Sequence, residues 1–148
     1  MKRNLLILAA VLLPLLCASA SKKEIPLEEL KAKAESTNSD QKSLLYVEVV
    51  RRQVEDANQL YIAGDVEKAQ NTVKEAVSYA EKARDAALSR PHKLKDTEIH
   101  LRLVEHRLND IRRTLALEDQ PDVQAASEQI ASIRKQLLAA MFSPKHKK

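Results

Sequence analysis

The chain has 148 residues, of which 44% are hydrophobic and only 3% aromatic, with one Gly and no Trp. Ala, Leu, Glu, Lys and Arg dominate, which is typical of helices and argues against a protein built from strands. The formal net charge is +4, but the first 20 and the last six residues hold five of the 25 basic residues and no acidic one. The remaining 20 basic and 21 acidic residues give a body without net positive charge, which argues against a nucleic-acid-binding protein.

Residues 1–20 are typical of a secretory signal peptide. Lys2 and Arg3 precede an apolar run from Leu5 to Leu16, and the small residues Ala-Ser-Ala end at residue 20, as at a cleavage site. A helix of this apolar run would be about 18 Å long, too short for a hydrocarbon core of about 30 Å. We therefore expect export to the periplasm or the extracellular space, with no stable membrane span after cleavage.

Cys17 is the only cysteine of the chain. A bacterial lipoprotein signal has a small residue directly before its cysteine, whereas Leu16 stands there, so lipidation of Cys17 is the less favoured alternative. Cleavage after Ala20 would remove Cys17, and the remaining chain could form neither disulfides nor thiolate metal sites.

The segment 21–39 is expected to be an N-terminal extension, either a short helix or flexible. A short helix can follow Pro26, and Ser39 or Asp40 can cap a new one. The alternative is one long helix from Pro26 to Ala63. At the other end, residues 143–148 are expected to form a basic disordered tail.

Four apolar stripes follow between residues 40 and 142. In each stripe the apolar residues step by three and four positions, which predicts a helix with a narrow buried face. The stripes are Val47, Val50, Val54, Ala57 and Tyr61; Val66, Ala69, Val73, Ala76, Ala80, Ala83 and Ala87; Leu101, Val104, Leu108, Ile111 and Leu115, with Leu94 one heptad earlier; and Val123, Ala126, Ile130, Ile133, Leu137 and Ala140. Short loops make sequential helices antiparallel neighbours, so the sequence predicts an all-α, antiparallel up-down-up-down four-helix bundle over residues 40–142.

The connections between the stripes carry turn signals. Gly64 can end the first helix in the left-handed conformation, and Asp65 can cap the second. Pro91 forbids continuation of the second helix, and Pro121 suits the first turn of the fourth.

The two halves of the predicted bundle match each other at a shift of 57 residues. Core and loop positions coincide, as in the pairs Val54 with Ile111 and Asp65 with Asp122. Since 57 is one more than eight heptads, the match does not follow from the heptad pattern alone. It indicates a duplicated helical hairpin.

The stretch YIAGDVEKA resembles the turn between the two helices of a tetratricopeptide repeat (TPR). Tyr61 stands where that family has an aromatic residue, Gly64 and Asp65 stand at the turn, and Ala69 and Ala76 stand at the small residues of the second helix. The resemblance covers about residues 57–80 and implies a partner-binding helical hairpin. The second helix runs for about 24 residues instead of about 14, and no copy follows at the repeat period of 34.

Residues that could carry chemistry are sparse. The single Gly argues against phosphate-binding loops, and His100 and His106 lack the spacings of helical metal sites. A non-covalent haem held by His100 and Met141 is a less favoured alternative. Both residues flank their stripes, whereas axial ligands should point into a pocket. We expect no catalytic residues, no metal and no cofactor.

The candidate interaction face consists of arginines from both halves, namely Arg51, Arg52, Arg107, Arg112 and Arg113. The alternative is that they are the solvated flanks of the stripes. The sequence thus favours an exported, non-catalytic helical module acting in protein–protein interaction or scaffolding in the cell envelope, with a groove between the hairpins as the partner surface. The alternatives are a self-associating structural protein and a bundle that binds a small ligand, metal or haem.

Overall fold

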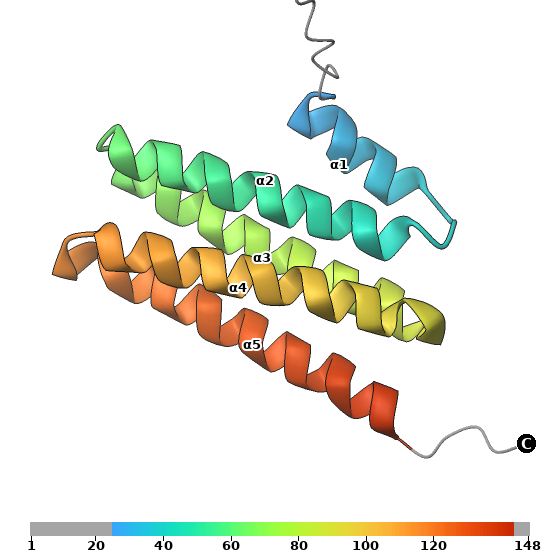
Figure 1. Ribbon diagram of the computed structural model, residues 1–148. Coiled ribbons are helices and arrows are strands. Elements are labelled where there is room, and N and C mark those ends of the chain that lie inside the picture. The colour runs from blue at the N-terminus through green and yellow to red at the C-terminus, as the bar shows by residue number, and fades with distance from the viewer. Residues whose placement is uncertain (1–24, 144–148) are drawn as a thin grey trace, which may run out of the picture.

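The computed structural model describes residues 25–143, which form five α-helices and two short 3-10 helices. They are α1 (Leu27–Ser36), α2 (Lys42–Ile62), α3 (Val66–Leu88), η1 (Pro91–Lys93), α4 (Leu94–Thr114), η2 (Leu117–Asp119) and α5 (Gln120–Phe142). The chain is all-α, as its composition predicts (Figure 1). The prediction of four helices is not confirmed, because α1 adds a fifth. The signal-like segment and residues 144–148 of the basic tail lie outside the described residues.

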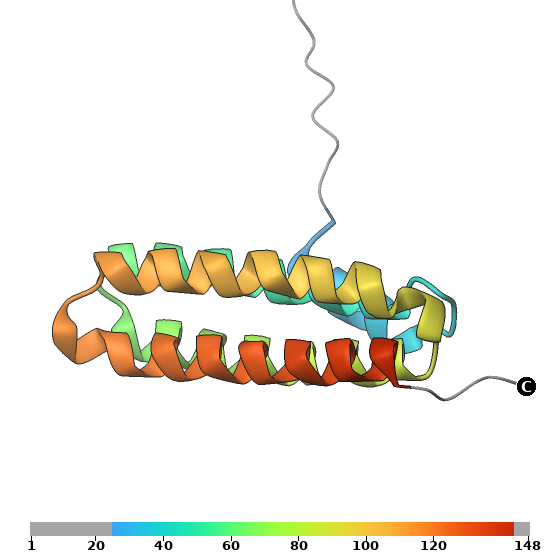
Figure 2. The ribbon, with the colours of Figure 1, turned by 60° about the horizontal axis from the view of Figure 1, so that its bottom comes forward.

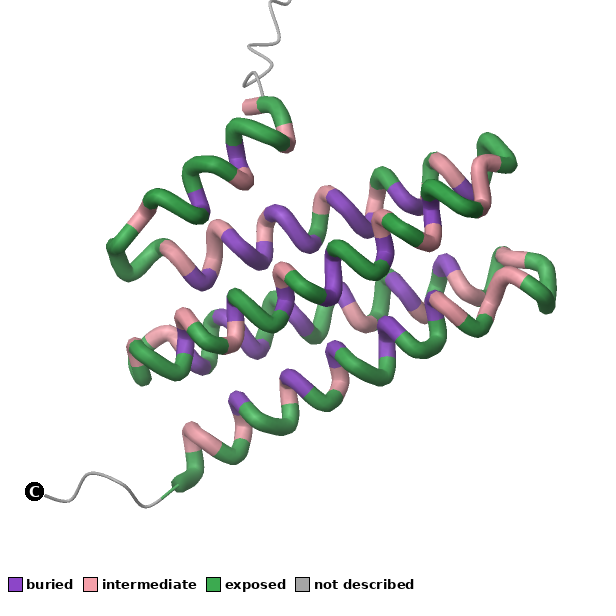
Figure 3. Tube along the Cα trace, turned by 180° about the vertical axis from the view of Figure 1, so that it is seen from behind, coloured by how far each residue is buried: buried purple, intermediate pink, exposed green. Residues whose placement is uncertain are grey.

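The four long helices bury nearly all of the apolar stripes that the sequence marks. From Val47 to Tyr61 on α2 and from Val123 to Leu137 on α5, every member of the stripe is buried. Only stripe members at helix ends are half-buried, namely Val66, Leu115 and Ala140. The buried segments in Figure 3 face the space between the helices, where they form one continuous core. Among the described residues, no helix is both long and apolar enough to cross a membrane.

The four long helices form two antiparallel hairpins, α2 with α3 and α4 with α5 (Figures 1 and 2). The hairpins stack with equivalent helices side by side, so that α2 packs against α4 and α3 against α5. Contacts between α2 and α4 join residues at an almost constant separation, 54 positions for Ser43 with Thr97 and 52 for Glu55 with Arg107. A constant separation means that α2 and α4 run parallel.

This stacking differs from the expected order of helices. The sequence predicts that α3 and α4 are close antiparallel neighbours because they follow each other in the chain. Instead α3 packs mainly against α2 and α5, and α4 packs mainly against α5 and α2. The connection from Ser89 to Lys93, with Pro91 at the start of η1, therefore crosses from one hairpin to the other diagonally.

Helix α1 lies beside α2, on the side away from α4 and α5 (Figure 1). It buries Leu30 and Ala34. Its carboxylate Glu35 accepts hydrogen bonds from Tyr46 of α2 and Lys82 of α3, at 3.0 and 2.5 Å. The segment that precedes α2 is therefore packed against the first hairpin, with apolar contacts along its middle and polar contacts at its end.

The turn between α2 and α3 has the geometry that its sequence predicts. Gly64 has φ +81°, in the left-handed region, and its N–H donates to the Tyr61 carbonyl. The N–H of Asp65 donates to the Leu60 carbonyl, which completes a Schellman motif. The Asp65 side chain does not cap α3 as expected, because its carboxylate pairs with Lys68 at 2.6 Å instead.

We predict that Gly64→Ala destabilises the protein by about 1 kcal/mol. The added methyl group meets nothing within 4 Å, so the cost comes from the positive φ alone. Urea denaturation measures it, and Gly64→Asn should cost less because Asn tolerates this conformation better. Equal stability of the Gly and Ala proteins would contradict the argument.

Candidate functional site

A groove of about 380 Å³ runs between α2 and α4. Its apolar lining comes from Leu44, Val47 and Val54 of α2 and from Leu103 and Val104 of α4. Val47, Val54 and Val104 belong to the core stripes and form the floor, whereas Leu103 is 61% exposed. The groove is thus an opening of the core onto the surface, between the two hairpins.

Helix periodicity explains why the groove lies there. Val104 and Leu101 point into the core, and Leu103 falls on the flank of α4 that faces α2. Leu44 stands one turn before Val47 on the matching flank of α2 and is half-buried. Because α2 and α4 are parallel and pack together through their core residues, these two flanks form the two walls of the groove.

Charged side chains surround the apolar lining. Arg107 of α4 reaches Glu55 of α2 with Nε and Nη2, at 3.0 and 2.9 Å, and so ties the two walls together. Arg51 binds Glu48 on α2 at 2.7 and 2.9 Å. The hydrogen bond from Arg107 holds the pKa of Glu55 below its usual value, because it outweighs the effect of burial. The hydrogen bonds from Arg51 and Arg52 likewise lower the pKa of Glu48, so both carboxylates stay ionised at neutral pH.

The structure does not gather the five arginines of the predicted interaction face. Only Arg51 and Arg107 line the groove. Arg52 points to the start of α1, where Nη1 donates to the Ile25 carbonyl at 2.5 Å. Arg112 and Arg113 lie at the end of α4, with contacts of 3.4 Å to Gln124 and Asp110.

The residues considered for haem or metal binding do not all line the groove. His100 stands on the groove wall, and its Nδ1 donates to the Asp96 carbonyl at 2.7 Å. His106 is exposed on α4, and Met141, half-buried on α5, does not line the groove. Within residues 25–143, no three side chains of the types that bind metals come together.

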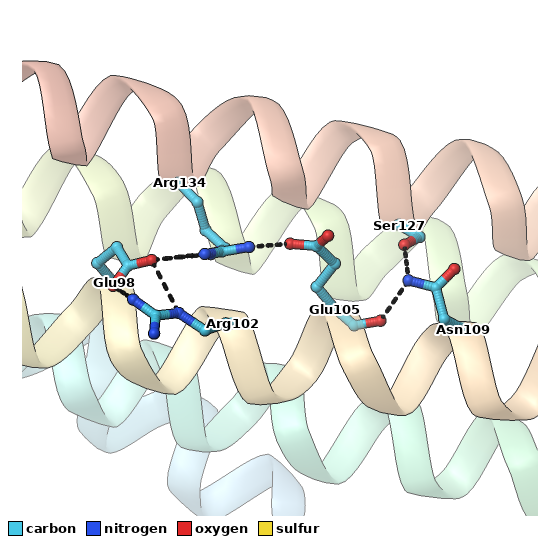
Figure 4. A network of polar contacts seen from close by, with 6 residues as sticks. All are labelled: Glu98, Arg102, Glu105, Asn109, Ser127 and Arg134. Atoms are coloured by element: carbon cyan, nitrogen blue, oxygen red, sulfur yellow. Dashed lines mark hydrogen bonds and ion pairs between the residues drawn. The ribbon is translucent and has the colours of Figure 1, made fainter.

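A polar network, of which the sequence indicates only one pair, joins α4 to α5 (Figure 4). Glu98 is only 2% exposed, and it accepts hydrogen bonds from Arg134 at 2.7 Å and from Arg102 at 2.6 Å. Arg134 also binds Glu105. In the next turns of α4, Asn109 donates to Ser127 at 2.9 Å. The i, i+4 spacing of Glu98 and Arg102 predicts their pair, but nothing local predicts Arg134.

We predict that stability falls as the pH is lowered through the acid range. Burial would raise the pKa of Glu98, but hydrogen bonds from Arg102 and Arg134 outweigh it and hold the pKa below its ordinary value of 4.5. A carboxyl with a lower pKa in the folded state stabilises fully above the unfolded pKa, and this contribution is lost as the pH falls through the folded value.

Urea denaturation at pH 7, 5 and 3 measures this effect. The free energy of unfolding should decrease below about pH 4.5, and Glu98→Gln should show a smaller decrease from a lower starting value. Stability that stays constant or rises on acidification would refute the assignment.

The groove is thus an opening of the core onto the described surface, and the polar network joins α4 to α5. The groove has an apolar floor and charged side chains on its walls, so it offers apolar contact with charged surroundings. Compared with known proteins, the chain matches no protein-family model, no curated protein and no solved structure.

Proposed function

We propose that this protein is an exported, non-catalytic helical module that binds another protein in the cell envelope through the groove between α2 and α4. One observation carries the proposal. The groove exposes Leu103 above a floor of core valines, between walls that carry charged side chains. Exposed apolar side chains inside a concave, charge-rimmed site are the usual features of protein recognition.

We also propose that the two hairpins are copies of one ancestral hairpin, joined as a four-helix bundle to which α1 is added. The match at a shift of 57 residues supports this, and so does the side-by-side stacking of equivalent helices. The TPR-like turn at Gly64 then belongs to one copy of the hairpin. Its counterpart in the second copy is the connection between α4 and α5.

The signal-like residues 1–20 support export. A periplasmic or extracellular location is tested by fractionation of the native cells and by sequencing the N-terminus of the mature protein. A mature chain that begins at Ser21 supports the proposal. Recovery of the uncleaved chain from the cytoplasm would refute it.

We predict that Leu103→Glu abolishes partner binding without unfolding the protein. Leu103 is 61% exposed, so a charge there should change stability by no more than about 0.5 kcal/mol. In the groove, however, a charged side chain would replace the apolar surface that the partner contacts and would have to lose its water on binding. The control is Leu117→Glu, because Leu117 is 81% exposed on η2 and does not line the groove.

Photo-crosslinking in the native envelope measures binding. A photoreactive amino acid in place of His100, on the groove wall, should give a crosslink to one other protein. Leu103→Glu should remove that crosslink and Leu117→Glu should keep it. Crosslinking that is absent, or equal in both variants, would refute the groove as the binding site.

A further inference from the structure

The exposed apolar side chains of the described residues gather at the two ends of the bundle. Six large apolar residues are exposed in that part of the chain, and four of them end a helix or begin a connection. Ile62 is the last residue of α2 and Leu117 the first of η2, at the end where both hairpins turn. Leu88 and Phe142 are the last residues of α3 and α5, at the opposite end (Figure 2). Each end thus offers two apolar side chains for contact.

The end that holds the two hairpin turns is acidic. It comprises residues 62–68 and 115–122, which include one basic residue, Lys68, and five acidic ones, namely Asp65, Glu67, Glu118, Asp119 and Asp122. Lys68 pairs with Asp65 at 2.6 Å, and no described residue forms an ion pair with the other four carboxylates. In the last turn of α4, Arg113 faces Asp110 at 3.4 Å, and only Arg112 has no carboxylate partner among the described residues. This acidic end therefore keeps a negative charge that its own residues do not balance.

The opposite end is basic. It comprises residues 38–42, 89–96 and 143–148, which include seven Lys or Arg residues and two Asp residues. Arg90 pairs with Asp40 at 2.7 Å. Three lysines and one aspartate of this end form no ion pair with a described residue, namely Lys42, Lys93, Lys95 and Asp96. The sequence adds three more lysines within six residues of Phe142. This basic end therefore keeps a positive charge.

The charges of the two ends cannot balance each other within one molecule. Helix α3 has 23 residues and spans about 35 Å at 1.5 Å per residue, so the two ends lie about as far apart. Charges exposed to water are screened over about 8 Å at physiological salt. The helix dipoles do not balance them either, because each end carries the N-termini of two long helices and the C-termini of the other two. The opposite charges can meet only when the acidic end of one copy contacts the basic end of another.

The two ends also match in their apolar residues and in their size. In an end-to-end contact, Ile62 and Leu117 of one copy would lie against the end of the next copy that carries Leu88 and Phe142. Apolar side chains with charges around them are the usual composition of a protein interface. Four helices, each about 10 Å across, give an end of about 20 by 20 Å, so the contact would bury about 800 Å² in total. A standard interface buries about 1,600 Å², and we therefore expect a weak, reversible contact.

From these observations we infer that the protein binds a second copy of itself end to end, with the acidic end of one copy on the basic end of the next. The two surfaces differ, so every contact leaves one free end of each kind, and the assembly grows as an open line of copies instead of closing as a dimer. The groove between α2 and α4 lies on the side of the bundle and shares no residue with either end. The inference therefore goes beyond the proposed function and does not depend on it.

Sedimentation of the full protein, purified from its own cells, tests the inference. Between about 10 µM and about 1 mM protein, the mean mass should rise with concentration beyond that of a dimer. The rise should be strong at about 0.01 M salt and nearly absent at about 1 M salt, because the screening length falls from about 30 Å to about 3 Å. A protein that stays monomeric at low salt, or a mean mass that does not respond to salt, would overturn the inference.

Two single substitutions distinguish an end-to-end contact from other forms of self-association. Leu117→Lys places a cation in the acidic end and Phe142→Glu places a carboxylate in the basic end, so each new charge meets like charges in the contact. Each variant alone should associate at least about tenfold more weakly than the native chain. Mixed together, the two variants should form a dimer with one copy of each and nothing larger, because one retains its basic end and the other its acidic end. Both residues are exposed, so neither substitution should unfold the protein.

The control is Glu81→Lys, which changes the charge of an exposed residue of α3 that lies outside both ends and should leave the association unchanged. A mixture of the two end variants that stays monomeric would overturn the end-to-end contact. Self-association that Leu103→Glu removes would place the contact in the groove and would also overturn it. The crosslink from position 100 reports on the groove alone, so it tests the proposed function whatever the sedimentation shows.

Discussion

Replacing Arg134 by methionine is expected to lower the free energy of unfolding by about 3 kcal/mol. Arg134 reaches from α5 to Glu98 and Glu105 on α4 (Figure 4). Without its guanidinium, Glu98, which is 2% exposed, keeps only Arg102 as a hydrogen-bonding partner. The loss lies at the low end of the range for a broken buried ion pair, about 3–5 kcal/mol, because Arg102 remains.

Urea denaturation at pH 7 with matched variants checks this result. Lys135→Met changes the exposed neighbour of Arg134 on the same helix and should shift stability by no more than about 0.5 kcal/mol. The double variant Glu98→Met with Arg134→Met should recover most of the loss, because it leaves no buried charge unpaired. An equal loss in Lys135→Met, or a double variant as unstable as the single one, would contradict the explanation.

The sequence predicts the helices and their inner faces because burial follows a local period. The small residues Ala80, Ala83 and Ala87 of α3 are predicted from their spacing alone, and all three are fully buried. Gly64 likewise has the left-handed conformation that its position predicts. These features depend on neighbours within a turn or two, and so they can be read from consecutive residues.

The order of the helices could not be predicted in the same way. A heptad stripe indicates that a helix has a buried seam, but it does not identify the helix on the other side. The parallel pairing of α2 with α4 rests on contacts more than 50 residues apart in the chain, such as Ser43 with Thr97 and Glu55 with Arg107. Nothing in the spacing of either stripe distinguishes this order from one in which each helix packs against the next helix in the chain.

The candidate site was predictable in part. A groove between the hairpins was expected, and Arg51 and Arg107 from the predicted face line the groove that the structure shows. Leu103 was not singled out, because it lies off the stripe and resembles an ordinary exposed leucine in the sequence. Its place on the groove wall depends on α2 lying opposite, and the stripes do not determine that pairing.

Gln53 shows the same limit, because it is fully buried although it lies outside the apolar stripe of α2. It stands seven residues after Tyr46 and four after Val49, so the three residues share one flank of α2. All three are buried, and Tyr46 contacts Glu35 of α1. The sequence of α1 is short and polar, and it does not indicate that this helix covers a second face of α2.

The burial of Gln53 leads to the second large effect that we expect, a gain in stability of about 2 kcal/mol for Gln53→Met. Neither the amide nitrogen nor the amide oxygen of Gln53 has a hydrogen-bonding partner among the described residues. Burying an amide without such partners costs about 1–3 kcal/mol in proteins. Methionine has a similar length, helix propensity and shape without the polar atoms, so it removes this cost while it fills the same space.

The control is Gln59→Met, on the same helix but exposed, which should change stability by no more than about 0.5 kcal/mol. Thermal and urea unfolding of both variants give the comparison. A Gln53→Met protein that is less stable than the native chain would mean that the amide of Gln53 makes hydrogen bonds in solution. These bonds would then stabilise the covered face of α2. A gain in stability for Gln53→Met but not for Gln59→Met would instead show that the amide of Gln53 is unsatisfied in the folded protein. Apolar packing and the contacts of Glu35 would then hold α1 on this face.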